Sequence, residues 1–250
     1  GDGRVDLVVA NFRSDDLSIL LGTGDGRFGA AQSIPVGREP LSVAVGDVNG
    51  DGFPDIVTAV HGAHEVVVLT GNGSGAFSVR TRLTGFDQPA DVQLGDFDGD
   101  GRLDLAVANY GTNQVILLRG NGAGVFNERT AIEVGRRPQR IGVGDVDGNG
   151  ALDVVSANEG DGSVSLLLND GTGNFTGPIR VGLPPDLSWR SVPQQVALGD
   201  LDGDADLDLV VPHFARGITV HFNEPAFHTV TVQLGDAVER DFGNQFVGGG

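Results

Sequence analysis

The sequence predicts an all-β fold made of repeated units of four short strands. The chain has 250 residues, of which 41 are Gly and 11 are Pro, and these residues separate short apolar runs. The pattern recurs every 49 residues over most of the chain, as the spacing of Asp47, Asp96 and Asp145 shows. A repeat of about 40–50 residues that holds four strands is typical of one blade of a β-propeller. We therefore expect a β-propeller of about five four-stranded blades.

The second unit shows the strands that we expect in each blade. Apolar runs at Leu41–Val45 and Ile56–Val60 lie on either side of an acidic loop, and a third run follows at Val66–Leu69. A Gly-rich turn at residues 71–77 leads into a more polar fourth run, Ser78–Leu83. Runs of this length between Gly, Asn and Pro indicate strands and no long helices. The second and third runs are apolar without alternation, so we expect them to be buried on both faces.

The repeat divides residues 1–234 into five units, and residues 235–250 form a tail that is either a closing strand or the end of the module. The units cover approximately residues 1–40, 41–89, 90–138, 139–193 and 194–234. The fourth unit has six extra residues around Leu183–Val192, which include Trp189, the only Trp.

The first unit begins inside the acidic loop and lacks its first strand, so we expect the chain to be a piece of a longer protein. Two arrangements remain open. Residues 238–247 supply the missing strand and close a five-bladed ring, or neighbouring repeats or subunits add blades to a larger propeller or assembly.

Four nine-residue acidic loops begin at Asp47, Asp96, Asp145 and Asp200. Each has oxygen-bearing side chains at positions 1, 3, 5 and 9, with Gly at position 4 and usually at position 6. Ca²⁺ takes six to eight oxygen ligands, and a Gly permits the sharp turn that brings them together. The predicted side-chain ligands are Asp47, Asn49, Asp51 and Asp55 in the first loop, Asp96, Asp98, Asp100 and Asp104 in the second, Asp145, Asp147, Asn149 and Asp153 in the third, and Asp200, Asp202, Asp204 and Asp208 in the fourth.

The four loops predict three to four structural Ca²⁺ ions. The fourth loop has Ala205 at position 6, where Ala is strained if its φ is positive. An EF-hand array is the alternative, because its loop has the same first positions. That interpretation fails because strands flank the loops and because position 12 lacks the bidentate Glu of an EF-hand. The residues at position 12 are Thr58, Val107, Ser156 and Val211.

The strand, acidic loop and strand, followed by a GxGxGxF turn, resemble the FG-GAP/VCBS repeat of integrin α-subunit propellers and of bacterial secreted or surface proteins. The resemblance covers residues 1 to about 223. It implies that the position-7 carbonyl oxygens also bind calcium, those of Phe53, Arg102, Ala151 and Asp206. It further implies a non-catalytic, extracellular or cell-surface propeller that acts in adhesion, binding or surface assembly.

The formal net charge is −18, and 15 of the 34 acidic residues lie in the four loops. A charge of this sign argues against nucleic acid and anionic membranes as partners, because both attract basic surfaces. The chain contains no Cys and no apolar run of 18 residues, so we expect neither disulfides nor membrane insertion.

The resemblance implies that a protein or glycan ligand binds the face opposite the calcium loops. The candidate residues combine amides, aromatic rings and Arg, which suits a sugar or an acidic peptide. They are Asn11, Asn109, Tyr110, Asn158 and His213 in the loops between second and third strands, and Trp189 and Arg190 in the insertion. An Asn in such a loop can also be present only because it tolerates a turn conformation.

Three alternatives to a simple adhesion module remain. The first is a lectin-like module that binds glycans through these residues. The second, which we favour less, is an enzyme that acts on polysaccharides, because no nucleophile–base arrangement is evident and the loop acids are assigned to metal. The third is head-to-tail self-assembly, because a heterologous contact that does not close gives open fibres.

Overall fold

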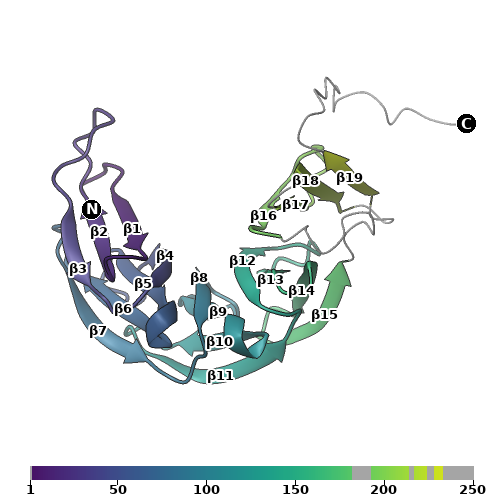
Figure 1. The fold of residues 1–250 in the computed structure, drawn as a ribbon, viewed down its shortest axis with the longest axis horizontal. Helices are drawn as coiled ribbons and strands as arrows, with labels where there is room; N and C mark the ends of the chain where they lie inside the picture. Colours follow the sequence, from purple (N-terminus) through teal and green to yellow (C-terminus); the bar gives the residue numbers. More distant parts are fainter. Residues whose placement is uncertain (1, 182–192, 214–216, 224–227, 233–250) are drawn as a thin grey trace, which may run out of the picture.

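The structure is a computed structural model that describes residues 2–181, 193–213, 217–223 and 228–232. These residues form five antiparallel sheets that follow one another in chain order around an arc (Figure 1). The first sheet contains β1 (Leu7–Asn11), β2 (Asp16–Leu20) and β3 (Gln32–Pro35), and the second contains β4 (Pro40–Gly46), β5 (Asp55–Val60), β6 (Glu65–Gly71) and β7 (Phe77–Leu83). The third contains β8 (Pro89–Gly95), β9 (Asp104–Asn109), β10 (Gln114–Gly120) and β11 (Phe126–Glu133), and the fourth contains β12 (Pro138–Gly144), β13 (Asp153–Asn158), β14 (Ser163–Asn169) and β15 (Phe175–Val181). The fifth contains β16 (Ala197–Gly199), β17 (Asp208–His213), β18 (Gly217–Phe222) and β19 (His228–Val232).

Each four-stranded sheet is a meander in which strands that are adjacent in the chain pair with each other. The first strands β4, β8, β12 and β16 lie on the inside of the arc, and the last strands β7, β11 and β15 lie on the outside (Figure 1). The inner strands β4, β8 and β12 contact one another in turn. The repeated four-strand unit predicted from the sequence is therefore confirmed as a propeller-like arrangement.

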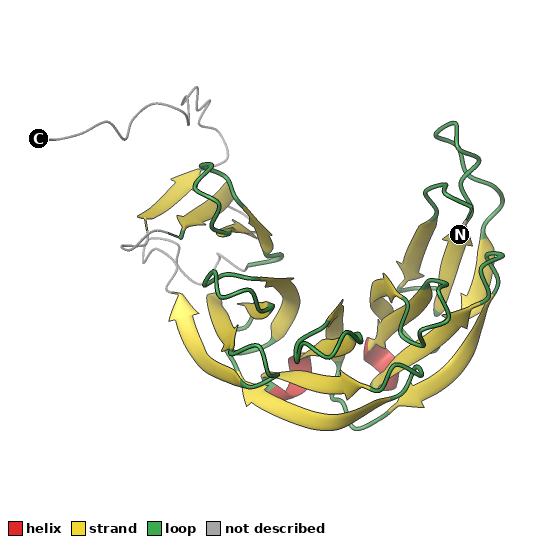
Figure 2. Ribbon diagram, turned by 180° about the vertical axis from the view of Figure 1, so that it is seen from behind, coloured by secondary structure: helices red, strands yellow, loops and turns green. Residues whose placement is uncertain are grey.

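The first sheet has only three strands in the part of the chain that the structure describes. Its β1 corresponds to the second strand of the other sheets, so no described strand covers its inward edge. Val5, which precedes β1, is 79% exposed, and Leu7 and Val9 are 41% and 42% exposed on the face of β1 opposite Val8 and Ala10, which pack toward the second sheet. The arc is open between the first and fifth sheets (Figures 1 and 2). Residues 238–247, the predicted closing strand, lie outside the described residues, so closure and the final blade number stay predictions.

Apolar side chains form a core between each pair of neighbouring sheets. Val57 and Val68 of the second sheet pack with Val107, Ile116 and Phe126 of the third. The other three clusters join the first sheet to the second, the third to the fourth, and the fourth to the fifth. The sheets are therefore held to one another by apolar contact along the whole described arc.

The aromatic residue after each Gly-rich turn faces the preceding sheet. Phe126 is 5% exposed, and the ring of Phe175 packs edge-on against Phe97 with 5.8 Å between ring centroids. Phe28 has the same place in the first sheet but is 39% exposed, because no described sheet precedes it.

The second strands are the most deeply buried elements. Every residue of β5, β9 and β13 is buried, as their unbroken apolar runs predicted. The only helices among the described residues are two single-turn 3₁₀ segments, η1 (His61–Ala63) and η2 (Tyr110–Thr112), which follow β5 and β9. No described helix has the length and apolar character that crossing a membrane requires.

Candidate metal centres in the acidic loops

The four acidic loops connect the first and second strands of their sheets, at β4–β5, β8–β9, β12–β13 and β16–β17. In each loop the residues at positions 4 and 6 have positive φ. Gly99 and Gly101 have φ values of 73° and 81°, and Gly148 and Gly150 have 72° and 87°. Ala205 has a φ of 77° at position 6 of the fourth loop. The strain expected for Ala at this position is therefore present, since a Cβ disfavours the left-handed region.

The Asp at position 9 is buried and holds the loop to two other parts of its sheet. These residues, Asp55, Asp104, Asp153 and Asp208, are at most 3% exposed. Their Oδ2 accepts the backbone N–H of position 2 at 2.7–3.1 Å, from Val48, Phe97, Val146 and Leu201 respectively. Their Oδ1 accepts a backbone N–H at or just after the end of the third strand at 2.7–3.0 Å, from Gly71, Gly120, Asn169 and Asn223. One carboxylate thus joins three segments of the blade.

The Asp at position 1 closes the turn of its own loop. In the third loop, Asp145 Oδ1 accepts the N–H of Asn149 at 3.0 Å, and Oδ2 accepts that of Gly150 at 2.8 Å. In the first loop, Asp47 accepts the N–H groups of Gly50 and Gly52 at 2.7 and 2.8 Å. These bonds hold the loop in one conformation and direct its carboxylates toward each other.

The carboxylates at positions 1, 3 and 9 converge in the second, third and fourth loops. Their nearest oxygens lie within 4.8 Å of one another in each group: Asp96, Asp98 and Asp104; Asp145, Asp147 and Asp153; Asp200, Asp202 and Asp208. The first loop has the amide of Asn49 at position 3. A set of carboxylate oxygens this close together suits a hard divalent cation such as Ca²⁺. The donor set therefore fits the predicted ion.

The residue at position 5 has a different place in the loop. It lies outside these three-residue groups, and its side-chain oxygen accepts the N–H of position 7. Asp51 accepts from Phe53 at 2.9 Å, Asp100 from Arg102 at 2.9 Å, and Asn149 from Ala151 at 2.7 Å. In this structure position 5 binds the backbone N–H of the residue whose carbonyl is the predicted ligand. Calcium binding by positions 5 and 7 stays a prediction.

Burial raises the pKa of Asp55, Asp104 and Asp153 above the ordinary value for Asp. The backbone N–H groups that each carboxylate accepts offset this effect only in part, and nearby loop carboxylates raise the pKa further. A bound divalent cation would act in the opposite direction, because an opposite charge favours the ionised carboxylate.

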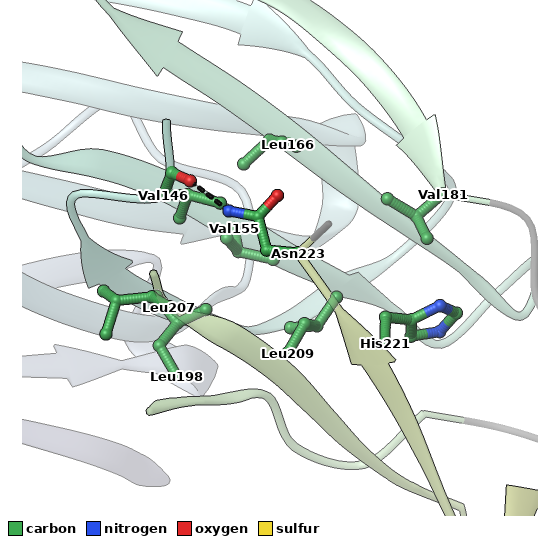
Figure 3. A pocket seen from close by; sticks show the side chains of 9 residues that line it. All are labelled: Val146, Val155, Leu166, Val181, Leu198, Leu207, Leu209, His221 and Asn223. Carbon is green, nitrogen blue, oxygen red and sulfur yellow. Dashed lines mark hydrogen bonds between the residues drawn. The ribbon is translucent and has the colours of Figure 1, made fainter. Parts of the chain in front are cut away.

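The first three loops also contact the following sheet, which sequence analysis did not predict. Gly124, in the Gly-rich turn of the third sheet, donates its N–H to the carbonyl of Val48 at 2.8 Å. Asn169 at the end of β14 donates from Nδ2 to the carbonyl of Phe97 at 2.8 Å. Asn223 makes the same contact with Val146 (Figure 3). The third strand ends at Gly71 in the second sheet and at Gly120 in the third. Asn169 and Asn223 stand at the equivalent place in the fourth and fifth sheets, and this change to Asn is the signal in the sequence for their contacts.

The predicted ligand residues on the opposite face are mostly bonded inside their own sheets. Asn158 is fully buried and donates from Nδ2 to Ser165 Oγ at 3.0 Å. Asn11 bonds Ser18 at 2.7 Å, and His213 Nε2 lies 2.8 Å from Thr219 Oγ1, at the same places in their sheets. These side chains join the end of the second strand to the third strand.

Asn109 is 1% exposed and accepts the N–H of Asp87 at 2.9 Å, which anchors the connection between sheets. Trp189 and Arg190 lie outside the described residues. Ligand contact by any of the predicted residues stays a prediction.

Tyr110 is one of two described residues of the predicted set that are not fully buried, the other being Asn11. It is half-buried at the start of η2, its ring meets His61 edge-on at 5.8 Å between centroids, and the Arg137 guanidinium lies 5.7 Å from its ring centroid. Residues 61, 110 and 159 are 49 apart, so successive sheets place His61, Tyr110 and Glu159 at the same loop position. An aromatic ring beside a cation and an acid is a chemistry that can bind a polar ligand.

Comparison with protein families gives one match, to the FG-GAP-like repeat. It covers residues 1–58, 52–107, 96–156 and 145–211, so the four matches together span most of the chain. Comparison with curated proteins gives no match.

Several solved structures share the fold. A protein from Lactobacillus plantarum is 18% identical with a TM-score of 0.59, over 93% of this chain and 68% of that one. An Agrocybe aegerita lectin that recognises non-reducing terminal N-acetylglucosamine is 20% identical with a TM-score of 0.58, over 94% of this chain and 67% of the lectin. A putative 6-phosphogluconolactonase from Bacteroides uniformis is 12% identical with a TM-score of 0.69, over 93% of this chain and 70% of that one. At these identities the likeness shows the fold alone.

Proposed function

Because the chain belongs to the FG-GAP-like repeat family, we propose that it is a calcium-stabilised, non-catalytic extracellular propeller that acts in adhesion, binding or surface assembly. The observation that carries the proposal is the convergence of three carboxylates in each of the last three loops. Without a cation, these groups repel one another across short distances.

A bound Ca²⁺ would neutralise each carboxylate cluster and connect the segments that its ligands already hold. In the second loop the ligands would be Asp96, Asp98 and Asp104. Asp104 also accepts the backbone N–H groups of Phe97 and Gly120, so the ion would brace the loop against the third strand. Ion binding would therefore stabilise each blade.

The proposed non-catalytic role is supported by the contacts of the loop acids. The buried Asp at position 9 accepts two backbone N–H groups, and the Asp at position 1 accepts those of its own turn. Carboxylates with these partners are positioned for structure and cation binding. The extracellular location is supported by the family.

Thermal unfolding with excess calcium and with chelator tests the proposal. If each ion stabilises the fold by about 1–3 kcal/mol near saturation, the Tm should rise by several degrees, at about 2–4 °C for each kcal/mol. Isothermal titration should give three to four ions per chain, and Mg²⁺ at equal concentration serves as the control cation. Equal Tm values in calcium and chelator, together with no heat of binding, would refute the proposal.

A lectin-like function is the second candidate, and the surroundings of Tyr110 favour it. Its half-buried ring lies near His61 and the Arg137 guanidinium on the face opposite the acidic loops. A glycan array in calcium should then give hits that a Tyr110→Ala variant loses, while the calcium-dependent Tm stays unchanged. An array without hits would contradict this function and would leave the calcium proposal standing.

Surface assembly is supported by the inward edge of β1. This edge has no described strand partner, and an unpaired strand can pair with a strand from another chain. Light scattering or electron microscopy at high protein concentration should show oligomers or filaments. A Val9→Lys substitution on this exposed strand should shift the population toward monomers without altering the Tm in calcium.

A further inference from the structure

One position of the repeat has polar side chains of different types on the inside of the arc. Ser42, Asp91 and Arg140 are 49 residues apart and lie on the neighbouring inner strands β4, β8 and β12. Gln195, just before β16, follows after 55 residues, the same spacing that separates the third and fourth acidic loops. All four side chains line one cavity of about 320 Å³, with Gln93 beside them. The repeat therefore gathers polar groups at one level of the inner wall.

Asp91 ties the three inner strands together at this level. It is 4% exposed, and its Oδ1 accepts the Ser42 hydroxyl from β4 and the N–H of Val92 at 3.0 Å. Its Oδ2 accepts the N–H of Ile141 from β12 at 2.9 Å. Both carboxylate oxygens are thus engaged by the protein, so Asp91 shapes the wall of the cavity.

Arg140 provides the free hydrogen-bond donors of the cavity. Its Nη1 donates to the carbonyl oxygens of Gln139 at 2.9 Å and Ala90 at 3.4 Å. A guanidinium has five N–H donors, and among the described contacts only Nη1 is engaged. The donors of Nε and Nη2 therefore remain for a planar anion, which Arg binds through two parallel hydrogen bonds.

The amides of Gln93 and Gln195 complete the polar lining. Neither makes a side-chain hydrogen bond within the part of the chain that the structure describes, and each can both donate and accept. Amides of this kind recognise hydroxyl groups. The volume of the cavity lies at the lower end of the range for small-molecule sites, about 300–1,000 Å³.

We propose that this inner cavity is a binding site for a small hydroxylated carboxylate, such as a sugar acid. Arg140 binds the carboxylate, and Gln93 and Gln195 bind the hydroxyl groups. A cation is the poorer fit, because the only acid in the lining already accepts hydrogen bonds on both oxygens. The site is separate from the acidic loops and from the Tyr110 face, so it does not depend on the function proposed above.

Titration calorimetry of the full chain in calcium tests the site with three probes: glucuronate, glucose and acetate. Glucuronate should bind at one site per chain, and glucose and acetate should each bind at least about tenfold more weakly, since each lacks half of the recognised groups. Glucose binding as tightly as glucuronate would overturn the assignment of a carboxylate. Absence of saturable glucuronate binding would overturn the site itself.

Two variants locate the binding within the chain. Arg140→Gln should weaken glucuronate binding by about 10–100-fold, the loss expected for hydrogen bonds to a charged group. Gln93→Leu places an apolar side chain at the cavity wall and leaves Arg140 and Asp91 unsubstituted. It should also weaken glucuronate binding. Arg136→Gln, in an exposed loop outside the cavity, is the matched control and should bind as the native chain does. Native affinity in a folded Arg140→Gln or Gln93→Leu variant would refute the proposal.

Discussion

Asn169 and Phe97 are 72 residues apart in the chain, and the Nδ2 of Asn169 donates a hydrogen bond of 2.8 Å to the Phe97 carbonyl oxygen. Phe97 is position 2 of the second acidic loop, and its own N–H is bound by Asp104. The same Asn169 donates to the Leu152 carbonyl at 3.0 Å, and its backbone N–H is bound by Asp153. One buried amide therefore connects the second acidic loop to the third.

Substitution of Asn169 by Ala should weaken the contact between the third and fourth sheets. It leaves two buried carbonyl oxygens, those of Phe97 and Leu152, without their side-chain donor, at a cost of about 1–3 kcal/mol. Urea unfolding in saturating calcium measures the change. Asn174→Ala is the control, because the Asn174 side chain bonds only Asp170 and Thr172 within its own exposed turn. An equal loss of stability in both variants would contradict a specific role for Asn169.

The stability lost on replacing Asp153 should appear even without calcium, whereas the stability lost on replacing Asp147 should appear mainly in calcium. Asp153 accepts backbone N–H groups on both oxygens, and Asn at this position would direct its NH₂ group at one of those donors. Asp153→Asn should therefore destabilise the fold by about 2–3 kcal/mol even in chelator. Asp147 accepts only the N–H of Asn149, and the first loop has Asn49 at the same position.

The matched variant Asp147→Asn should change the unfolding free energy in chelator by less than about 0.5 kcal/mol, as is usual for surface substitutions. In calcium it should lose part of the metal-dependent stabilisation. Denaturation of both variants with and without calcium gives the comparison. If Asp147→Asn were as damaging in chelator as Asp153→Asn, the separation of the two roles would be wrong.

The spacing of 49 residues was enough to predict the strands and loops, and the three strands that the described residues give to the first sheet. Strand Ile56–Val60, for example, is predicted within one residue of the observed β5. The burial of Asn158 was not predictable in this way, because it depends on the register that pairs Asn158 with Ser163 and brings Ser165 within reach of its Nδ2. The polar inner wall was also missed. Ser42, Asp91 and Arg140 share the repeat spacing, but they differ in side-chain type, so no motif marks them.

Ala205 is a position where the fold can be stabilised. Its φ of 77° disfavours a residue with a Cβ, so Ala205→Gly should raise the unfolding free energy by about 1 kcal/mol. It should also strengthen calcium binding by the fourth loop. Gly101→Ala is the reciprocal test, because a Cβ there meets no atom within 4 Å and only the backbone strain is added. This variant should lose about 1 kcal/mol. Ala151→Gly is the control, and a gain in stability there would contradict the explanation.

The buried His221 should make the stability of the fifth sheet depend on pH. It lies opposite Leu209 in β17 and lines a small apolar cavity (Figure 3), at the register that Leu69, Leu118 and Leu167 occupy in other sheets. Burial lowers the pKa of His221 below 6.5, and nearby His213 lowers it further. The unfolded state therefore binds a proton at a higher pH than the folded state does. The unfolding free energy should fall as the pH drops through 6.5 toward the lowered pKa.

His221→Leu should remove this part of the pH dependence, because Leu has no group that titrates. Urea unfolding between about pH 7.5 and 5.5, with and without calcium, separates the effect from metal release, since His titrates in this range. Some dependence of the unfolding free energy on pH should remain in this variant because of His61. Burial lowers the pKa of His61 as well. His64→Asn is the matched control, because His64 is exposed and Asn113 has the same left-handed conformation one repeat later. An unchanged slope in His221→Leu would show that the acid sensitivity arises elsewhere.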